Sequence, residues 1–497
     1  MSFIQFENVG FSYGDGSEPV FSGLTLRLDT DWKLALVGDN GRGKTTLLKL
    51  LSGDLKGGGR ISVNTDVKMF PLKITDKSLT PYEIFCELCA DTEFWKLQRE
   101  FNLLELDEEI LYRPYGTLSG GEQTKFQLAA VFAGDGFVLI DEPTDHLDAE
   151  GRKRVSEYLL RKRGFIAASH DRSFLSCCDH VLALEKGGVF LTRGGYPVYA
   201  EERDKRTAAE ESEKRKLENE RERLARAAAR ISDWGDSAER NVSNRNGRLS
   251  DVYASVDRGF LSARAARVQK RAASVADRYE KAQQGIKNVL AAMDETEDIR
   301  LQPEKFFRSE LLTLKNVSVR ASGKTLFSAL DLRVEEGERI AVAGVNGCGK
   351  STLLKLICGI LPDGFCAEGQ INIPARLKIS YVPQSADYCG SLAEFAAERN
   401  ISEGYFKAVL SKFGFAGKDL ARDMRLMSEG QKKKAAIAAS LCGKANLYVW
   451  DEPLNYLDVS ARERLESALV SSGATCIFVE HDVSFTQRVA TRVLDLG

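Results

Sequence analysis

The strongest constraint on this chain is that it repeats itself. The segment LALVGDNGRGKTTLLKLLSG at 34–53 matches IAVAGVNGCGKSTLLKLICG at 340–359. Two further pairs follow at nearly the same offset: FVLIDEPTDHLD (137–148) with LYVWDEPLNYLD (447–458), and FIAASHDRSF (165–174) with CIFVEHDVSF (476–485). A nearly constant offset between matching segments means that one domain occurs twice in the chain. One fold must therefore account for both halves.

The length and the repeats together predict three parts. A chain of 497 residues is too long for one hydrophobic core. The first copy is expected at 1–199 and the second at 309–497, with a different segment at 200–308 between them. Apolar runs such as 137–140 and 447–450 have the composition of buried strands and alternate with amphipathic segments. Each copy is therefore predicted to be an α/β domain around a mostly parallel sheet.

The middle segment has the composition of a long helix pair. It is rich in Ala, Arg and Glu, and apolar residues recur with steps of four and three from Leu261 to Met293. That spacing is typical of an a/d seam between two helices. Gly235, Gly247 and Gly259 lie in the interval before this seam. We expect two antiparallel helices joined by a tip loop near 235–258.

Both copies contain the pattern GxxxxGK[ST] between an apolar strand and a helical segment. In this context the backbone N–H groups of the loop wrap phosphates, the lysine reaches the β/γ phosphates, and the hydroxyl binds Mg²⁺. One match could be an ordinary loop before a helix, but two corresponding matches predict two ATP sites. The residues expected at ATP are Gly38, Asp39, Asn40, Gly41, Arg42, Gly43, Lys44, Thr45 and Thr46, and in the second copy Gly344, Val345, Asn346, Gly347, Cys348, Gly349, Lys350, Ser351 and Thr352. The fold class is thus α/β, with two tandem P-loop domains joined by a helical hairpin.

The catalytic groups are expected at the ends of the next strands. Asp141 and Asp451 are predicted to hold Mg²⁺ together with Thr45 and Ser351. Glu142 and Glu452 follow directly and are predicted to orient or deprotonate the attacking water. His170 and His481 occupy equivalent places after a further strand, where a structural histidine is the alternative to a sensor of the γ-phosphate. The cofactors predicted from this set are ATP and Mg²⁺.

A third motif indicates the family. Leu118 begins LSGGEQ and Met427 begins MSEGQ. These segments resemble the signature motif of ATP-binding cassette proteins, although a short SGG segment can also be a plain helix cap. In that family the signature faces the P-loop of the opposite domain. The resemblance adds to the ATP sites the residues Ser119, Gly120, Gly121 and Glu122, and Ser428, Glu429, Gly430 and Gln431.

The resemblance also implies how the halves combine. The set Lys44, Asp141, Glu142 and His170 is expected to work with Ser428–Gln431, and the set Lys350, Gln384, Asp451, Glu452 and His481 with Ser119–Glu122. A single chain then suffices, as a monomer with intramolecular pairing of its cassettes.

The two sites differ in sequence. Gln384 in YVPQ resembles the Q-loop glutamine of the family, expected at ATP and Mg²⁺, but Leu72 stands at the matching place in the first copy. Tyr13 is placed to stack on adenine, with surface packing as the alternative, and Ala321 is near that place in the second copy. Glu429 replaces a glycine that is usual in the signature. We expect the two sites to hydrolyse ATP at different rates.

Composition restricts the biological setting. The net charge is −2, and no run of about 18 apolar residues or N-terminal signal segment occurs, so we expect a cytoplasmic protein without membrane contact. The ten cysteines include one lone CxxC, at Cys86 and Cys89, which is too few ligands for a zinc site.

Two cassettes joined by a helical arm resemble the ABC-F family, whose members act on the ribosome. EPTDHLD, MSEGQKKK and DRGFLSARAARVQKR (257–271) are closest to its Lsa-type antibiotic-resistance branch. The short stretch from Leu72 to Leu118 and the end of the chain soon after His481 agree with that branch. The resemblance implies that the arm enters the exit site of the 70S ribosome, near tRNA and the 23S rRNA of the peptidyl-transferase centre. It also implies protection from lincosamides, pleuromutilins and group A streptogramins.

The arm has residues that suit RNA. Between 221 and 271 twelve basic residues stand against six acidic ones. Arginine favours phosphate contact, and aromatic rings can stack on bases. The alternative is a solvated helical face whose aromatic rings pack on the helices. The residues expected to touch the ribosome are Arg240, Arg245, Arg248, Tyr253, Arg258 and Phe260.

The sequence is also compatible with two other functions. One is a housekeeping translation factor of the same family. The other is an ATPase subunit of a transporter with separate membrane partners, although membrane coupling needs no long basic hairpin between cassettes.

Overall fold

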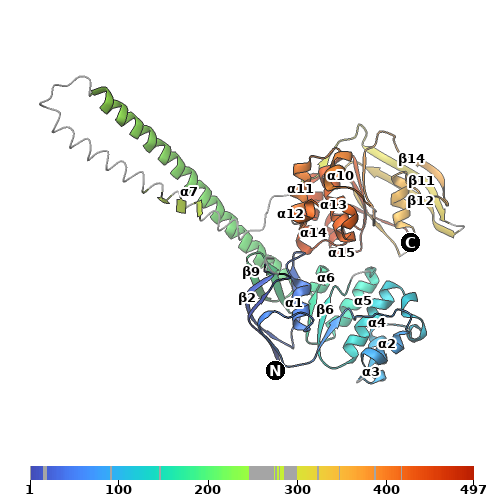
Figure 1. The fold of residues 1–497 in the computed structure, drawn as a ribbon. Coiled ribbons are helices and arrows are strands. Elements are labelled where there is room, and N and C mark those ends of the chain that lie inside the picture. The colour runs from blue at the N-terminus through green and yellow to red at the C-terminus, as the bar shows by residue number, and fades with distance from the viewer. Residues whose placement is uncertain are drawn as a thin grey trace. The chain divides into compact units, whose positions relative to one another are not determined.

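A computed structural model describes the chain at 2–14, 19–89, 92–144, 147–245, 274, 277–278, 280–281, 283–284, 299–321, 324–345, 347–385, 388–415 and 417–497. It divides into two compact units, one formed by Met1–Tyr199 with Glu297–Gly497 and the other by Ala200–Thr296. The first unit holds both repeats (Figure 1). We call the repeats the first and second cassette, and the second unit the arm.

The first cassette is built on a sheet with the order β5-β6-β7-β3-β8-β9. Neighbouring strands are parallel except β8 and β9, which form an antiparallel hairpin. The strands are β3 (Lys33–Gly38), β5 (Val67–Phe70), β6 (Phe137–Asp141), β7 (Phe165–Ala168), β8 (His180–Glu185) and β9 (Gly188–Arg193). A separate antiparallel sheet has the order β2-β1-β4, from β1 (Phe3–Phe11), β2 (Phe21–Asp29) and β4 (Gly58–Val63).

Helices complete the first cassette. The helix α1 packs in a common core with both sheets, where Leu47, Leu36 and Phe6 are fully buried. The remaining helices lie mostly to one side of the strands (Figure 1). Their bounds are α1 (Lys44–Leu51), α2 (Pro81–Leu88), α3 (Phe94–Leu104), η1 (Glu108–Tyr112), η2 (Tyr115–Thr117), α4 (Gly120–Ala133), α5 (Ala149–Leu160) and α6 (Arg172–Leu175).

The second cassette repeats this plan. Its parallel sheet has the order β15-β17-β18-β13-β19, and its antiparallel sheet the order β12-β11-β14. The strands are β11 (Glu310–Ala321), β12 (Lys324–Glu335), β13 (Arg339–Ala343), β14 (Phe365–Asn372), β15 (Ile379–Val382), β17 (Leu447–Asp451), β18 (Cys476–Val479) and β19 (Arg492–Asp495). The helices are α9 (Lys350–Ile357), α10 (Leu392–Glu398), α11 (Glu403–Lys412), α12 (Gly417–Leu420), η3 (Met424–Leu426), α13 (Glu429–Cys442), α14 (Val459–Ser472) and α15 (Val483–Val489).

The strand β17 explains why a run of apolar residues precedes the acidic pair. Successive side chains of a strand point to opposite faces of its sheet. Tyr448 and Trp450 belong to the core shared with the helices α11 and α13, while Leu447 and Val449 belong to the core shared with α9 and the antiparallel sheet. A strand buried on both faces needs apolar residues throughout. The sequence prediction of an α/β fold with two tandem cassettes is confirmed.

The boundary at 308 differs from the sequence prediction. The segment 299–308 belongs to the second cassette, since Ile299 and Leu301 are buried in its core. Gln302–Pro303 forms the short strand β10, which pairs in parallel with β16 (Lys444–Ala445). The amide of Asn446 also donates to the carbonyl of Glu304 at 2.9 Å. The burial of Ile299 and Leu301 and the pairing of β10 with β16 therefore place this segment in the second cassette, although a helix-like composition precedes it.

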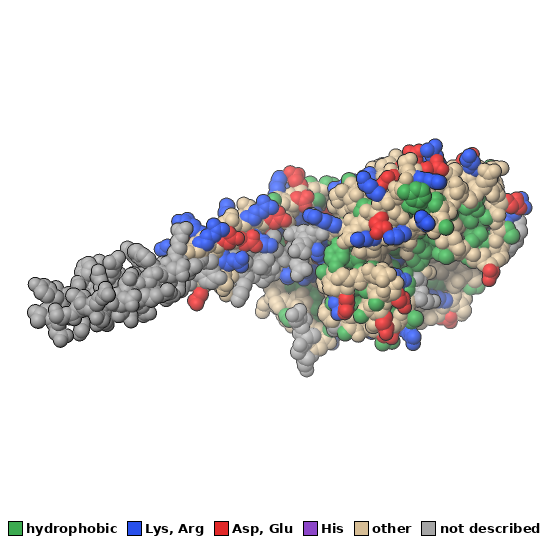
Figure 2. Space-filling view, turned by 90° about the horizontal axis from the view of Figure 1, so that it is seen from above, with side chains coloured by type: hydrophobic (Ala, Val, Ile, Leu, Met, Phe, Trp, Pro, Cys, Tyr) green, Lys and Arg blue, Asp and Glu red, His purple; other side chains and the backbone are tan. Residues whose placement is uncertain are grey.

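The arm contains the helix α7 (Tyr196–Arg245) from Ala200 onward, and helical residues at 274, 277–278, 280–281 and 283–284. Acidic and basic side chains alternate along its described surface (Figure 2). Glu201 pairs with Lys205 at 2.7 Å and Glu222 with Arg226 at 3.2 Å, both one helical turn apart. Such pairs stabilise the exposed face of a helix.

The predicted tip loop begins too early. The helix α7 continues through Gly235 to Arg245, where the glycine signals predict a loop from 235. A glycine inside a helix costs only about 1 kcal/mol relative to alanine, so a long helix can tolerate it. The apolar residues of the seam predicted over 261–293, and the rest of the loop, lie outside the described residues. Every helix in the described part of the chain is too short or too polar to cross a bilayer.

Substitutions at Gly235 test whether α7 is helical at this position. Gly235→Ala should slow amide hydrogen exchange in the adjoining turns of α7 by roughly twofold to fivefold, because alanine stabilises a helix interior by about 0.5–1 kcal/mol. Gly235→Pro should speed exchange in the same turns. Unchanged exchange in both variants would contradict the helix at this position.

Candidate functional site

The first phosphate loop connects β3 to α1 and has an unusual backbone. Gly41 and Gly43 have φ values of 85° and 95°, which only glycine adopts without strain. A Cβ on Gly43 would lie 2.5 Å from Val20 Cγ1, so no side chain fits there. Lys44 is buried and folds back over the loop, donating to the carbonyl of Gly38 at 2.7 Å. The glycine conformations and the Lys44 hydrogen bond together fix the shape of the loop.

The second loop repeats this geometry. Gly347 and Gly349 have φ values of 84° and 101°. Lys350 Nζ donates to the carbonyls of Gly344 at 2.7 Å and Val345 at 3.0 Å. Asn346, which the sequence predicts at ATP, lies outside the described residues. The other predicted loop residues are in the loops or first turns of α1 and α9, namely Asp39, Asn40, Arg42, Thr45, Thr46, Cys348, Ser351 and Thr352.

Two hydroxyl–carboxylate pairs offer oxygen ligands for a cation. Thr45 Oγ1 donates to Asp141 Oδ2 at 2.7 Å. In the second cassette Asp451 is 1% exposed, and neither of its carboxylate oxygens has a hydrogen-bond partner among the described residues. Burial raises the pKa of Asp451, although the neighbouring Ser351 hydroxyl and Lys433 oppose that shift. An unsatisfied buried carboxylate beside a hydroxyl fits a hard cation such as Mg²⁺.

The glutamates after these aspartates have a strained backbone. Glu142 and Glu452 have φ values of 51° and 50°. Such φ values are uncommon for residues other than glycine and cluster at functional sites. His170 Nε2 lies 3.3 Å from Glu142 Oε1, and His481 Nε2 lies 3.7 Å from Glu452 Oε1. The structure thus brings each predicted glutamate and histidine together.

Burial sets the protonation of these groups. It lowers the pKa of His170 well below its ordinary value, and the positive charges of Lys44 and Arg462 add to the shift. His170 is therefore a neutral imidazole near pH 7, able to donate one hydrogen bond and accept another. For Glu452, burial would raise the pKa, but hydrogen bonds from His481 and Gln384 bring it below its ordinary value. Glu452 is therefore ionised and available as a base.

The two cassettes meet at the first phosphate loop. The backbone N–H of Asn40 donates to Asp458 Oδ2 at 2.9 Å, and the Asn40 side chain donates to the carbonyl of Tyr456 at 3.0 Å. Arg172 of α6 forms a buried ion pair with Glu466 of α14 at 2.8 Å. The segment before α14 in the second cassette thus faces the ATP site of the first.

A cavity of about 1570 Å³ lies between the cassettes. Its wall combines the first phosphate loop with the second signature, as the sequence predicts for the first site. Residues on this wall include Tyr13, Lys44, Thr45, Asp141, Glu142, His170, Ser428, Gly430 and Gln431. Lys350, Ser351, Gln384, Glu452 and His481 line another part of it. The first site is therefore composed of residues from both halves.

The second predicted pairing is not brought together in the same way. The described part of the cavity wall does not include Ser119–Glu122; from the first cassette it also has Thr144, Leu147 and Arg152. Ser119 accepts from the backbone N–H of Glu122 and caps α4. Within the described residues, the cavity therefore joins the first phosphate loop, but not the second, to the signature of the opposite cassette.

The loops at Leu72 and Gln384 are held by different side chains. The backbone N–H of Leu72 donates to Gln127 Oε1 at 2.8 Å, and Gln127 donates to the Tyr115 hydroxyl at 2.6 Å. In the second cassette the buried Lys433 donates to the carbonyls of Pro383 and Asp451, each at 2.5 Å. The second loop is thus tied directly to the strand that carries Asp451.

Tyr13 lies at the rim of the first site. The residue is 65% exposed, its ring meets Phe11 edge-to-face with the centroids 5.0 Å apart, and its hydroxyl is 2.7 Å from Thr46 Oγ1. An exposed ring held in place beside the phosphate loop is suited to stacking on a base.

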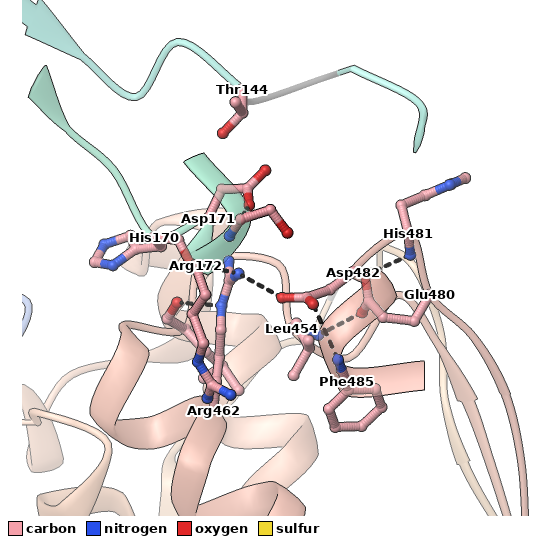
Figure 3. A network of polar contacts seen from close by, with 12 residues as sticks. Thr144, His170, Asp171, Arg172, Leu454, Arg462, Glu480, His481, Asp482 and Phe485 are labelled. Atoms are coloured by element: carbon pink, nitrogen blue, oxygen red, sulfur yellow. Dashed lines mark hydrogen bonds and ion pairs between the residues drawn. The ribbon is translucent and has the colours of Figure 1, made fainter. Parts of the chain in front are cut away.

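Sequence reasoning missed two buried cations near these sites, Lys433 and Arg462. Arg462 donates to the carbonyl of His170 at 2.9 Å, across the junction of the cassettes (Figure 3). The repeat offers a signal for Arg462, since Arg152 and Arg462 both follow the last aspartate of the acidic motif by four positions. Lys433 has no such signal, because Thr124 occupies the matching place.

The predicted ribosome contacts are not placed by the structure. Arg240 and Arg245 lie on α7, but their side chains are outside the described part. Arg248, Tyr253, Arg258 and Phe260 also lie outside it.

Comparison with known proteins agrees with this geometry. The family model described as ABC transporter matches residues 21–145 and 327–455, together more than half of the chain. The chain therefore belongs to the ATP-binding cassette family, and it is an ATP hydrolase.

Relatives that match over nearly the full length narrow the family. The ribosome protection protein VmlR of Bacillus subtilis is 25% identical, over 97% of this chain and 85% of that protein. ABC transporter F family member 5 of Arabidopsis thaliana is 25% identical, over 100% of this chain and 75% of that protein. The putative ATP-binding protein YdiF of Bacillus subtilis is 26% identical, over 100% and 80%. These matches confirm the ABC-F resemblance, and the Lsa-type branch remains a prediction.

Solved structures support the fold. The archaeal ribosome recycling factor aABCE1, in its complex with the stalk protein aP1, has a TM-score of 0.63 at 20% identity, covering 98% of this chain and 87% of that one. At this identity the likeness concerns the fold alone.

The asymmetry of the two sites predicts unequal mutant effects. Glu142→Gln should lower kcat for ATP by a larger factor than Glu452→Gln, because the first site already has the opposite signature on its wall. We expect at least a tenfold loss for Glu142→Gln, about 1.4 kcal/mol in the barrier. The measurement is steady-state phosphate release.

Glu150→Gln is the matched control. Glu150 is exposed on α5 and pairs with Arg154 at 2.5 Å, so turnover should be unchanged. Equal losses from Glu142→Gln and Glu452→Gln would contradict the asymmetry.

Proposed function

We propose that the chain is a ribosome-binding ATPase that protects the ribosome from antibiotics. In its ATP-bound closed state it binds the 70S ribosome and inserts the arm toward the peptidyl-transferase centre. There it reduces occupancy by lincosamide, pleuromutilin and streptogramin A drugs. The observation that carries the proposal is the match to VmlR, a ribosome protection protein, over 97% of this chain, arm included.

The proposed roles of the site residues follow from their positions. Lys44 and Lys350 hold the β/γ phosphates within their glycine loops. Glu142 and Glu452 orient and deprotonate water, and His170 and His481 contact the γ-phosphate. Thr45 with Asp141, and Ser351 with Asp451 and Gln384, would hold Mg²⁺, whose charge offsets that of the phosphates.

ATP acts as the link between the cassettes in this proposal. Ser428 and Gln431 face the same cavity as Lys44 and Glu142, which supports a γ-phosphate bound from both sides. The helix start at Ser428 adds backbone N–H donors and a favourable dipole. Hydrolysis removes the shared phosphate, the contact weakens, and the protein leaves the ribosome.

The arm provides the RNA contact. Its stretch 221–271 has twice as many basic as acidic residues, while the chain as a whole has a net charge of −2. Binding to phosphates through Lys and Arg releases counterions and weakens with salt. Arg240, Arg245, Arg248, Tyr253, Arg258 and Phe260 are the proposed contacts.

A housekeeping role in translation is the second candidate. YdiF is 26% identical and ABC transporter F family member 5 is 25% identical, close to the 25% of VmlR. A role as transporter subunit is less well supported, because the arm would have no part in membrane coupling.

Co-sedimentation tests ribosome binding. The double variant Glu142→Gln/Glu452→Gln with ATP should move with 70S ribosomes in a sucrose gradient, and rising salt should release it. The double variant Lys44→Ala/Lys350→Ala is the control and should stay at the top of the gradient. Migration of the Glu142→Gln/Glu452→Gln variant with membranes would instead favour an ATPase subunit of a transporter.

Drug susceptibility separates protection from housekeeping. Expression in a sensitive host should raise the inhibitory concentration of a lincosamide or pleuromutilin by at least fourfold. The double Glu→Gln variant and a 240–256 deletion should abolish the increase. Native-like ribosome binding with no increase for any of the three drug classes would rule out protection and leave the translation factor.

A further inference from the structure

Arg462 lies where both ATP sites meet. It is in the first turn of α14 and is 8% exposed. Its Nε donates to the carbonyl of Leu457 at 3.0 Å, inside its own cassette. Its Nη1 donates to the carbonyl of His170 at 2.9 Å and lies 3.6 Å from Asp482 Oδ2 (Figure 3).

Each of these partners is adjacent to a site residue. His170 belongs to the first site, where it lies beside Glu142. Leu457 precedes Asp458, which accepts the N–H of Asn40 in the first phosphate loop. Asp482 follows His481 of the second site and caps α15 by accepting from Phe485 N at 3.0 Å. One planar guanidinium therefore touches elements of both sites.

Burial makes these contacts strong and directional. Asp482 is 7% exposed, and the side chain of Arg462 is also largely removed from water. A buried charge that loses its partners is costly, and the guanidinium donates in a fixed fork that lysine cannot reproduce. A displacement of the His170 backbone would therefore shift the Arg462 guanidinium, and this shift would in turn displace Asp482.

The first cassette offers a matched comparison. Arg152 occupies the equivalent position and donates to the carbonyl of Leu147 at 3.1 Å, which repeats the local bond. Within the described residues it has no bond to the carbonyl of His481. Asp171, the counterpart of Asp482, accepts from Ser173 N at 2.9 Å and caps α6. The link across the cassettes is thus built by one of the two arginines.

We propose that Arg462 is a positioning residue that couples the two ATP sites, joining the His170 segment of the first site to the Asp482 segment of the second. Its contacts are the carbonyls of Leu457 and His170 and the carboxylate of Asp482. It sets where the His170 backbone lies when the cassettes close. Turnover at one site then depends on the state of the other.

Additivity of turnover is the readout. The Glu452→Gln variant reports the first site and the Glu142→Gln variant the second. If the sites are coupled, the turnover of the unsubstituted protein differs from the sum of the turnovers of these two variants. We expect a difference of at least threefold. In the Arg462→Lys background the three rates should become additive within about 30%, with the KM for ATP changed less than twofold. Loss of folding alone would lower all three rates together.

Arg152→Lys is the control and should retain the native non-additivity. Asp482→Asn is a second variant, since asparagine still caps a helix but carries no charge. It should give additive rates even where Arg462→Lys does not fold. Additive rates in the unsubstituted protein, retained non-additivity in both test variants, or equal effects of Arg152→Lys and Arg462→Lys would each overturn the proposal.

Discussion

The contact on which the structure depends is the one between the first phosphate loop and the second cassette. Asn40 donates twice to the segment before α14, to Asp458 and to Tyr456. This contact brings Ser428 and Gln431 to the cavity that Lys44 and Glu142 also line. A triphosphate bound there would have donors from both halves of the chain within reach. Binding energy at one small site can therefore control the position of two domains.

The asymmetry of the sites follows from small changes in a duplicated domain. Arg172 pairs with Glu466 across the cassettes, whereas Val483 and Ser156 stand at the corresponding places and cannot form an ion pair. Lys433 ties the loop at Gln384 to the strand of Asp451, and Gln127 instead holds the loop at Leu72. Each cassette keeps the same backbone plan while its supporting polar contacts differ. Two copies of one fold can in this way have separate kinetic roles.

Much of the fold and of the site could be predicted from local patterns. The glycine loops, the strands that end in Asp141 and Asp451, and the histidines are each specified within about a dozen neighbouring residues. The internal repeat then confirmed each pattern by its second copy. The signature residues depended on the family resemblance, because a capped helix start alone does not indicate which loop it faces.

Other features could not be predicted because they depend on tertiary contacts. Arg462 and His170 are 292 residues apart in the sequence, so no local pattern can predict their hydrogen bond. The segment at Ile299 and Leu301 follows an arm-like composition, yet burial in the second cassette decides its place. Gly235 favours a turn, but it lowers the stability of a helix by only about 1 kcal/mol relative to alanine, and the long helix α7 continues through it.

The most direct test of the central claim is a nucleotide-bound structure of the Glu142→Gln/Glu452→Gln variant. We expect the γ-phosphate in the first site to lie within hydrogen-bond distance of both Lys44 Nζ and Ser428 Oγ, with the Asn40–Asp458 contact retained. A triphosphate held by Lys44 alone, open to solvent on the side of Ser428, would contradict it.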